Sequence, residues 1–308
     1  GENPSSAMGQ QRYYNKAELL ILVSNSTVNV QVKTPFDAAP TTIPWTNASY
    51  FLNTNVTFTD QRQGQTILTT EFDVAKFNQW SASNSFVASK LGAGSVPNIV
   101  YVADNRTITS TTLPAVRLVN GTTLSSRGLT VATPSPLYVK GHFNCTNSAH
   151  LGTTNTTSSR PASLIGDAIT VLSTSWSDAL SSSTLTSRNA GSTTVNAALL
   201  AGVVYSAGSN GNAPFSGGVM NFTRLLEDWS SDTLTLNGSI VNLFDSVRAT
   251  APFQNPGVYY YAPSRNFNFD PNFLDVTKQP PGTPEVRTLI RGSWVNARPN
   301  TTNYVESY

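Results

Sequence analysis

The sequence predicts a mainly β protein, folded as a right-handed parallel β-helix with inserted loops and one or two short helices. Four seven-residue segments share one pattern, with apolar residues at the first, third and seventh positions and glycine at the fifth. The segments span 137–143, 162–168, 198–204 and 234–240. Their glycines, at positions 141, 166, 202 and 238, lie 25, 36 and 36 residues apart. A strand pattern recurring at 20 to 40 residues is typical of stacked coils. A β-sandwich whose strands happen to contain glycine is the alternative.

Residues 1–110 are predicted to form a β-rich cap. Residues 17–23 are apolar, 24–26 carry a turn signal, and Val28, Val30 and Val32 alternate with polar residues, which predicts a β-hairpin. Asp73 is suited to cap a short helix over 74–80, where apolar side chains recur at helical spacing. Residues 98–102 are predicted to form a buried strand.

Residues 111–250 are predicted to form the β-helix body, with Val139, Leu164, Leu200 and Leu236 stacked inside it. The Ser, Thr and Asn-rich segments 144–160 and 173–194 are expected to be surface insertions, where contacts can vary without disturbing the core. The apolar residues of 222–229 have the spacing of a one-faced helix of about three turns; they are Phe222, Leu225, Leu226 and Trp229.

Residues 251–308 are predicted to be an extended arm that packs on the body. Proline and asparagine interrupt regular structure there, while the aromatic rings need burial. A platform of rings that stacks on sugars is the alternative use of these side chains; they include Phe253, Tyr259, Tyr260, Tyr261, Phe267, Phe269, Phe273 and Trp294.

The composition limits the chemistry. The 308 residues include 12% charged ones with a net charge of +2, so nucleic acid and anionic membrane are not expected partners. The only cysteine, Cys145, excludes an internal disulfide. His142, Cys145 and His150 are close in sequence but too few to predict a metal site, and Cys145 is expected to be a packed thiol.

The acidic residues do not form a predicted catalytic pair. Asp167 is the only acid within the four glycine-containing segments, and one carboxylate cannot serve as both proton donor and base. The other acids considered are scattered; they are Glu227, Asp228, Asp270 and Asp275. We therefore predict no catalytic, cofactor-binding or metal-binding residue and no enzymatic activity. A glycan-active β-helix enzyme remains the alternative, with a partner acid supplied by a loop.

Ten Asn-x-Ser/Thr sequons occur, at Asn25, Asn47, Asn55, Asn105, Asn120, Asn144, Asn155, Asn221, Asn237 and Asn300. They are consistent with N-glycosylation in a secretory route. They also arise by chance in a chain this rich in asparagine, serine and threonine, so both interpretations stay open.

Five runs of sequence resemble a family of large bacterial surface proteins known as PilX-like or pilus-assembly-associated; they are 11–16 (QRYYNK), 117–121 (RLVNG), 128–141 (GLTVATPSPLYVKG), 221–229 (NFTRLLEDW) and 280–284 (PPGTP). The resemblance implies an exported protein, whose complete form would have a hydrophobic pilin-like helix before Gly1. No catalytic residue follows from it.

Composition and resemblance together predict a non-catalytic structural or adhesive subunit outside the cell. Its expected partners are other surface or pilus proteins, including further copies of itself. A carbohydrate-binding or glycan-active protein is the alternative function, with glycans as partners. No cofactor is expected.

Overall fold

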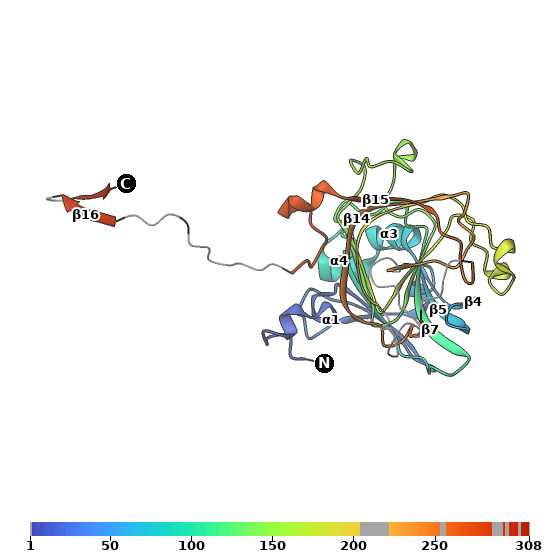
Figure 1. The fold of residues 1–308 in the computed structure, drawn as a ribbon. Helices are drawn as coiled ribbons and strands as arrows, with labels where there is room; N and C mark the ends of the chain where they lie inside the picture. Colours follow the sequence, from blue (N-terminus) through green and yellow to red (C-terminus); the bar gives the residue numbers. More distant parts are fainter. Residues whose placement is uncertain are drawn as a thin grey trace.

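The computed structural model describes residues 2–203, 222–252, 257–284, 292, 296–300 and 303–307. Its strands form a nine-stranded and a six-stranded sheet (Figure 1). The nine-stranded sheet has the order β15 (Ser264–Phe269), β14 (Thr233–Asp245), β12 (Thr193–Val203), β10 (Ala162–Gly166), β8 (Leu129–Ala132), β6 (Ile99–Asp104), β1 (Leu19–Val23), β2 (Val28–Val32), β3 (Thr41–Ile43). The six-stranded sheet has the order β13 (Thr223–Arg224), β11 (Ile169–Leu172), β9 (Leu137–Lys140), β7 (Thr112–Val119), β5 (Gln65–Asp73), β4 (Leu52–Asp60).

Four α-helices accompany these sheets among the described residues; they are α1 (Tyr13–Lys16), α2 (Trp45–Ala48), α3 (Val74–Ser83) and α4 (Ser85–Leu91). Helices α3 and α4 carry the chain from β5 in one sheet to β6 in the other. Near the C-terminus, β16 (Asn296–Asn300) and β17 (Asn303–Ser307) pair as a separate antiparallel two-stranded sheet.

From β5 to β14, successive strands alternate between the two sheets. Neighbouring strands within each sheet then run parallel, as in the β8–β10, β10–β12 and β7–β9 pairs. Among the described strands, antiparallel pairing is confined to the N-terminal strands β1 to β5 and to β16–β17. Because side chains alternate along a strand, each strand sends one set of residues into the space between the sheets.

The main hydrophobic core lies between the sheets. Leu164 and Leu199 contribute to it from the nine-stranded sheet, and Val139 and Val171 contribute from the six-stranded one. Phe77 of α3 is also fully buried in this core. A second cluster lies on the opposite face of the six-stranded sheet; it contains Phe58, Ile67, Leu113, Ala115, Tyr138, Leu172, Trp176 and Leu226. The predicted insertion 173–194 therefore covers this face through Trp176.

The predicted fold class is wrong: the described residues form a mixed α/β structure with two mostly parallel sheets, and not a parallel β-helix or a mainly β sandwich. The four glycine-containing segments do not stack as one column. The first is β9 of the six-stranded sheet, whereas the others are β10, β12 and β14 of the nine-stranded sheet. The glycines are also out of register, because Gly166 lies opposite Ala201 and Gly238 lies opposite Ala197.

Two finer predictions are also wrong. Leu200 is not a core residue, because Leu199 points into the core and Leu200 lies on the opposite face. No helix forms over 222–229, where β13 is followed by irregular chain. Phe222, Leu226 and Trp229 are buried without a helical backbone, so their helical spacing is coincidental.

Three local predictions for the N-terminal part of the chain are confirmed. Strands β1 and β2 form the expected antiparallel hairpin. Asp73 caps α3, since its Oδ1 accepts a hydrogen bond from the backbone N–H of Lys76 at 3.0 Å. The strand predicted at 98–102 is β6. Phe253, Trp294 and Asn221 lie outside the described residues.

Candidate functional site

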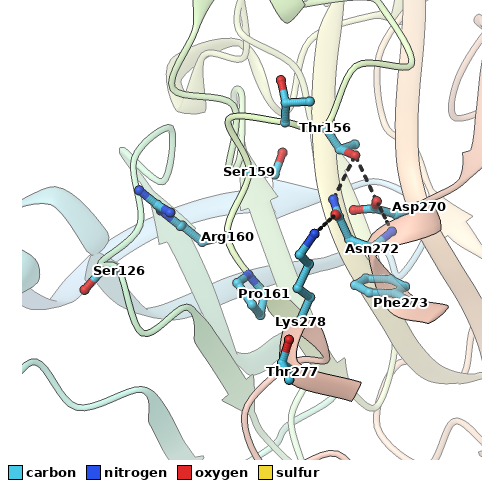
Figure 2. Close-up of a pocket in the computed structure, with 11 residues that line it drawn as sticks. Ser126, Thr156, Ser159, Arg160, Pro161, Asp270, Asn272, Phe273, Thr277 and Lys278 are labelled. Atoms are coloured by element: carbon cyan, nitrogen blue, oxygen red, sulfur yellow. Dashed lines mark hydrogen bonds between the residues drawn. The ribbon is translucent and has the colours of Figure 1, made fainter. Parts of the chain in front are cut away.

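A polar pocket of about 380 Å³ lies between the loop 156–161 and the segment 270–278 that follows β15 (Figure 2). A third stretch of chain contributes Ser126. The lining residues are Ser126, Thr156, Thr157, Ser159, Arg160, Pro161, Asp270, Asn272, Phe273, Thr277 and Lys278. The fold brings the segments 156–161 and 270–278 together from positions more than a hundred residues apart in the chain.

The loop wall of the pocket is fixed to the nine-stranded sheet by asparagine side chains. Asn144 donates from Nδ2 to the Arg160 carbonyl at 2.7 Å, and its Oδ1 accepts from the Arg160 N–H at 2.8 Å. Asn196 of β12 donates from Nδ2 to Ser159 Oγ at 2.8 Å. Because both hydrogen-bonding sides of Asn144 are used, the backbone at 159–160 is held in one place.

Asp270 joins the two walls. Its carboxylate is 5% exposed, and Oδ1 accepts from Thr156 Oγ1 at 2.8 Å and from the Asn272 N–H at 3.0 Å. The Asn272 side chain then donates from Nδ2 to Thr156 Oγ1 at 3.1 Å, and its Oδ1 accepts from Lys278 Nζ at 3.3 Å. Figure 2 shows this chain of hydrogen bonds at one end of the pocket.

An aromatic surface borders the same cavity. The Phe273 ring lines the pocket and is half-buried. Phe269, at the end of β15, meets it edge to face with ring centroids 6.2 Å apart, and its side chain is 56% exposed. The pocket therefore combines hydroxyl, amide and charged groups with an apolar ring, but Asp270 is the one carboxylate among its lining residues.

A second cavity, of about 500 Å³, holds two carboxylates on the six-stranded sheet. Arg117 donates to Glu71 Oε2 at 2.6 and 2.9 Å and to Asp178 at 2.6 and 2.9 Å. Burial alone would raise the pKa of Asp178. Arg117 donates hydrogen bonds to this carboxylate and attracts its negative charge, and these two effects hold the pKa of Asp178 below its usual value. An acid held ionised by a guanidinium is a poor proton donor, so this group is best explained as a structural ion triad.

A third cavity, of about 740 Å³, lies over β6, β8 and β10 and is lined by Tyr13, Tyr14 and Tyr101. The rings of Tyr14 and Tyr101 meet at 5.5 Å and 89°. Among the described residues, one ion pair lies at the rim of this cavity. It joins Arg12 to Glu2, and both side chains are exposed. This cavity is larger and more aromatic than the pocket of Figure 2, whose lining is mostly hydroxyl, amide and charged side chains.

The histidines and the cysteine do not form a site. His142 Nδ1 accepts from the Thr194 N–H at 3.1 Å, and burial lowers the pKa of its imidazole. His150 is hydrogen-bonded through Nδ1 to Ser158 Oγ at 2.9 Å. Cys145 is buried, and burial raises the pKa of its thiol. Within the described ranges, no group of three or more His, Cys, Asp or Glu is placed to hold a metal ion.

Of the five acids considered from the sequence, Asp270 alone lines the pocket. Asp167 is buried and accepts from the backbone N–H groups of residues 247, 248 and 249 at 2.6–3.1 Å, so it anchors that turn. Glu227 is buried against Ser173. Asp228 and Asp275 accept hydrogen bonds from Ser230 and Thr277, close in the chain.

Thr156, Arg160, Asn272 and Lys278 were not predicted as site residues. The prediction of 144–160 as a segment available for contacts and the assignment of Phe273 to an aromatic arm were the only indications of this region. Neither indicated that the two segments would meet.

Comparison of the chain with known protein families, curated proteins and solved structures finds no match. In the part of the chain that the structure describes, no helix has the length and apolar character needed to span a membrane.

Proposed function

We propose that this protein is a non-catalytic adhesive subunit outside the cell that binds a saccharide in the pocket of Figure 2. The observation that carries the proposal is the convergence of hydroxyl, amide, carboxylate and cationic side chains beside the Phe273 ring, in one 380 Å³ cavity. Ligand sites typically enclose about 300–1,000 Å³ and contain a few polar groups that fix orientation. The volume here suits one or two sugar rings.

A saccharide fits this mixture of groups. Its hydroxyls both donate and accept hydrogen bonds, so they suit amide and hydroxyl side chains such as Asn272 and Ser159. Its C–H faces suit an aromatic ring, and Phe273 offers one at the pocket wall. The walls are braced by Asn144 and Asp270 without a ligand, which reduces the entropy lost on binding.

Binding without turnover is favoured by the arrangement of the acids. Glycoside hydrolysis uses a pair of carboxylates on either side of the scissile bond. The pocket is lined by the single carboxylate of Asp270, which already accepts two hydrogen bonds. The charge-poor surface and the resemblance to bacterial surface proteins support a location outside the cell and contacts with other surface or pilus proteins.

Glycan-array screening of the full chain, followed by titration calorimetry of the best saccharide, tests this function. We expect Phe273→Ala to weaken binding by up to about tenfold, because a stacked ring contributes roughly 0.5–1.5 kcal/mol. The matched control is Phe267→Ala on β15, a partly exposed ring that does not line the pocket. Absence of any saccharide binding, equal losses in both variants, or hydrolysis of the bound saccharide would contradict the proposal.

A further inference from the structure

The charges that line the pocket are unequally compensated. Asp270 is buried, and its Oδ1 receives a hydroxyl and a backbone N–H, so its charge is already stabilised within the wall. Arg160 and Lys278 are exposed cations on the same cavity. In Figure 2 the Arg160 guanidinium is directed away from the Asp270 cluster, on the side of Ser126, whereas Lys278 Nζ points toward Asn272.

Neither cation has a close ionic partner among the described residues. The Arg160 side chain forms no ion pair with a described carboxylate, and Arg160 hydrogen-bonds to Asn144 through its backbone. Lys278 Nζ lies 3.9 Å from Asp275 Oδ2, with both side chains about half exposed. Asp275 Oδ1 already accepts from the N–H and hydroxyl of Thr277 at 2.9 and 2.7 Å. Exposed pairs of this length contribute little, so Lys278 remains available to a ligand.

We infer that the pocket binds an acidic saccharide, with its anionic group held by Arg160 and Lys278 and its neutral hydroxyls directed toward Asn272 and Ser159. This inference rests on the proposed function and specifies its ligand class. A guanidinium binds a carboxylate or a sulfate through two parallel hydrogen bonds, and such charge-assisted bonds are roughly twice as strong as neutral ones. The buried, hydrogen-bonded Asp270 lies at the Asn272 end of the pocket, away from the Arg160 guanidinium, which limits its repulsion of the anion.

The test compares matched saccharides by titration calorimetry on the full chain. The probes are trigalacturonate against galactotriose, sialyllactose against lactose, and a sulfated lactose. We expect at least one acidic probe to bind ten or more times more tightly than its neutral counterpart, and to lose affinity between 50 and 300 mM NaCl as exposed charges are screened. The carboxylated and sulfated arms identify which anionic group is preferred, and either preference supports the inference.

Charge-removing variants localise the effect. Arg160→Gln and Lys278→Gln should each reduce the preference for the acidic probe while leaving neutral binding nearly unchanged. Arg12→Gln and Lys76→Gln remove exposed cations that do not line this pocket and should change nothing. Both target side chains are exposed, so thermal unfolding should show that all four variants fold.

The outcomes separate this inference from the proposed function. Equal affinity for acidic and neutral probes would overturn the acidic ligand class. If Phe273→Ala also weakened the binding of both probes, the pocket would still be a saccharide site. The inference would also be overturned if Arg12→Gln or Lys76→Gln lost the preference for the acidic probe while Arg160→Gln and Lys278→Gln kept it. The anionic group would then bind elsewhere on the protein. Failure of every saccharide to bind would overturn both proposals.

Discussion

Glu227 is a buried acid whose protonation is coupled to folding. Its carboxylate accepts from Ser173 N–H at 2.7 Å and from Ser173 Oγ at 2.6 Å. Burial raises its pKa to about 7, against the lowering effects of Ser173 and the nearby Arg188. The ordinary value is 4.5, so between these two pH values the folded state retains a proton that the unfolded state has released.

The free energy of unfolding should therefore fall as pH rises from about 4.5 to about 7. A raised pKa of this size corresponds to a loss of about 3 kcal/mol across that interval. Urea unfolding of the wild type and Glu227→Gln at a series of pH values measures the contribution of this side chain as their difference. Asp228→Asn, in the next and less buried residue, is the control. Equal pH dependence in the wild type and Glu227→Gln would show that the carboxyl is not coupled to folding.

The glycines of the recurrent pattern are required for different reasons. A Cβ on Gly238 would lie 1.9 Å from the Ala197 carbonyl oxygen and 2.6 Å from its carbon, on the neighbouring strand. A Cβ on Gly141 would meet no atom within 4 Å, but this residue has φ near +77°, which favours glycine. The common spacing thus does not reflect one shared corner of the fold.

These environments predict unequal costs for the same substitution. Gly238→Ala should destabilise the protein by about 3 kcal/mol or more, because the contact is with the backbone of the neighbouring paired strand, which cannot move aside freely. Gly141→Ala should cost about 1–2 kcal/mol, the usual penalty for a left-handed conformation. Chemical denaturation of both variants measures these values. A larger loss for Gly141→Ala than for Gly238→Ala would contradict this explanation.

At the scale of elements, a row of asparagines ties the loop wall of the pocket to the sheet. Asn196, Asn237 and Asn268 lie opposite one another on β12, β14 and β15. Asn237 Nδ2 donates to Asn196 Oδ1 at 2.9 Å and to the Thr153 carbonyl at 2.9 Å, and Asn268 Nδ2 donates to Asn237 Oδ1 at 3.2 Å. Because Asn196 also holds Ser159, the row extends to the pocket.

Removal of the central amide should loosen that loop. Asn237→Ala leaves the buried acceptor of Asn196 without this donor, at a cost of about 1–3 kcal/mol. Hydrogen exchange of residues 150–160 should accelerate in this variant and remain unchanged in Asn55→Ala, an exposed residue on β4. Unchanged exchange in Asn237→Ala would show that the asparagine row does not hold the loop.

Local elements were predictable where the signal is local. The β1–β2 hairpin follows from alternation around a turn, and α3 follows from its Asp73 cap. The helix expected over 222–229 failed because the second hydrophobic cluster buries Leu226 on the far side of the six-stranded sheet, while Phe222 and Trp229 belong to the main core. Helical spacing cannot distinguish one apolar face from burial on two sides.

At the scale of the whole molecule, the fold class was not predictable from the recurrent glycine pattern. Strand β11, Ile169–Leu172, separates β10 from β12 along the chain but lies in the other sheet, and it carries no glycine. The pattern therefore identified buried strands but did not show that they are divided between two sheets. The pocket was equally hidden, because its walls at 156–161 and 270–278 meet only through pairing of β10, β12, β14 and β15.

We propose the pocket between 156–161 and 270–278 as a saccharide site, and this can be tested directly. The most direct measurement is a crystal structure of the full chain with the tightest-binding saccharide from the array. We predict a sugar ring against Phe273, hydrogen-bonded to Asn272, with any anionic group between Arg160 and Lys278. A saccharide bound instead in the cavity lined by Tyr13, Tyr14 and Tyr101, or on the Arg117 ion triad with this pocket empty, would contradict it.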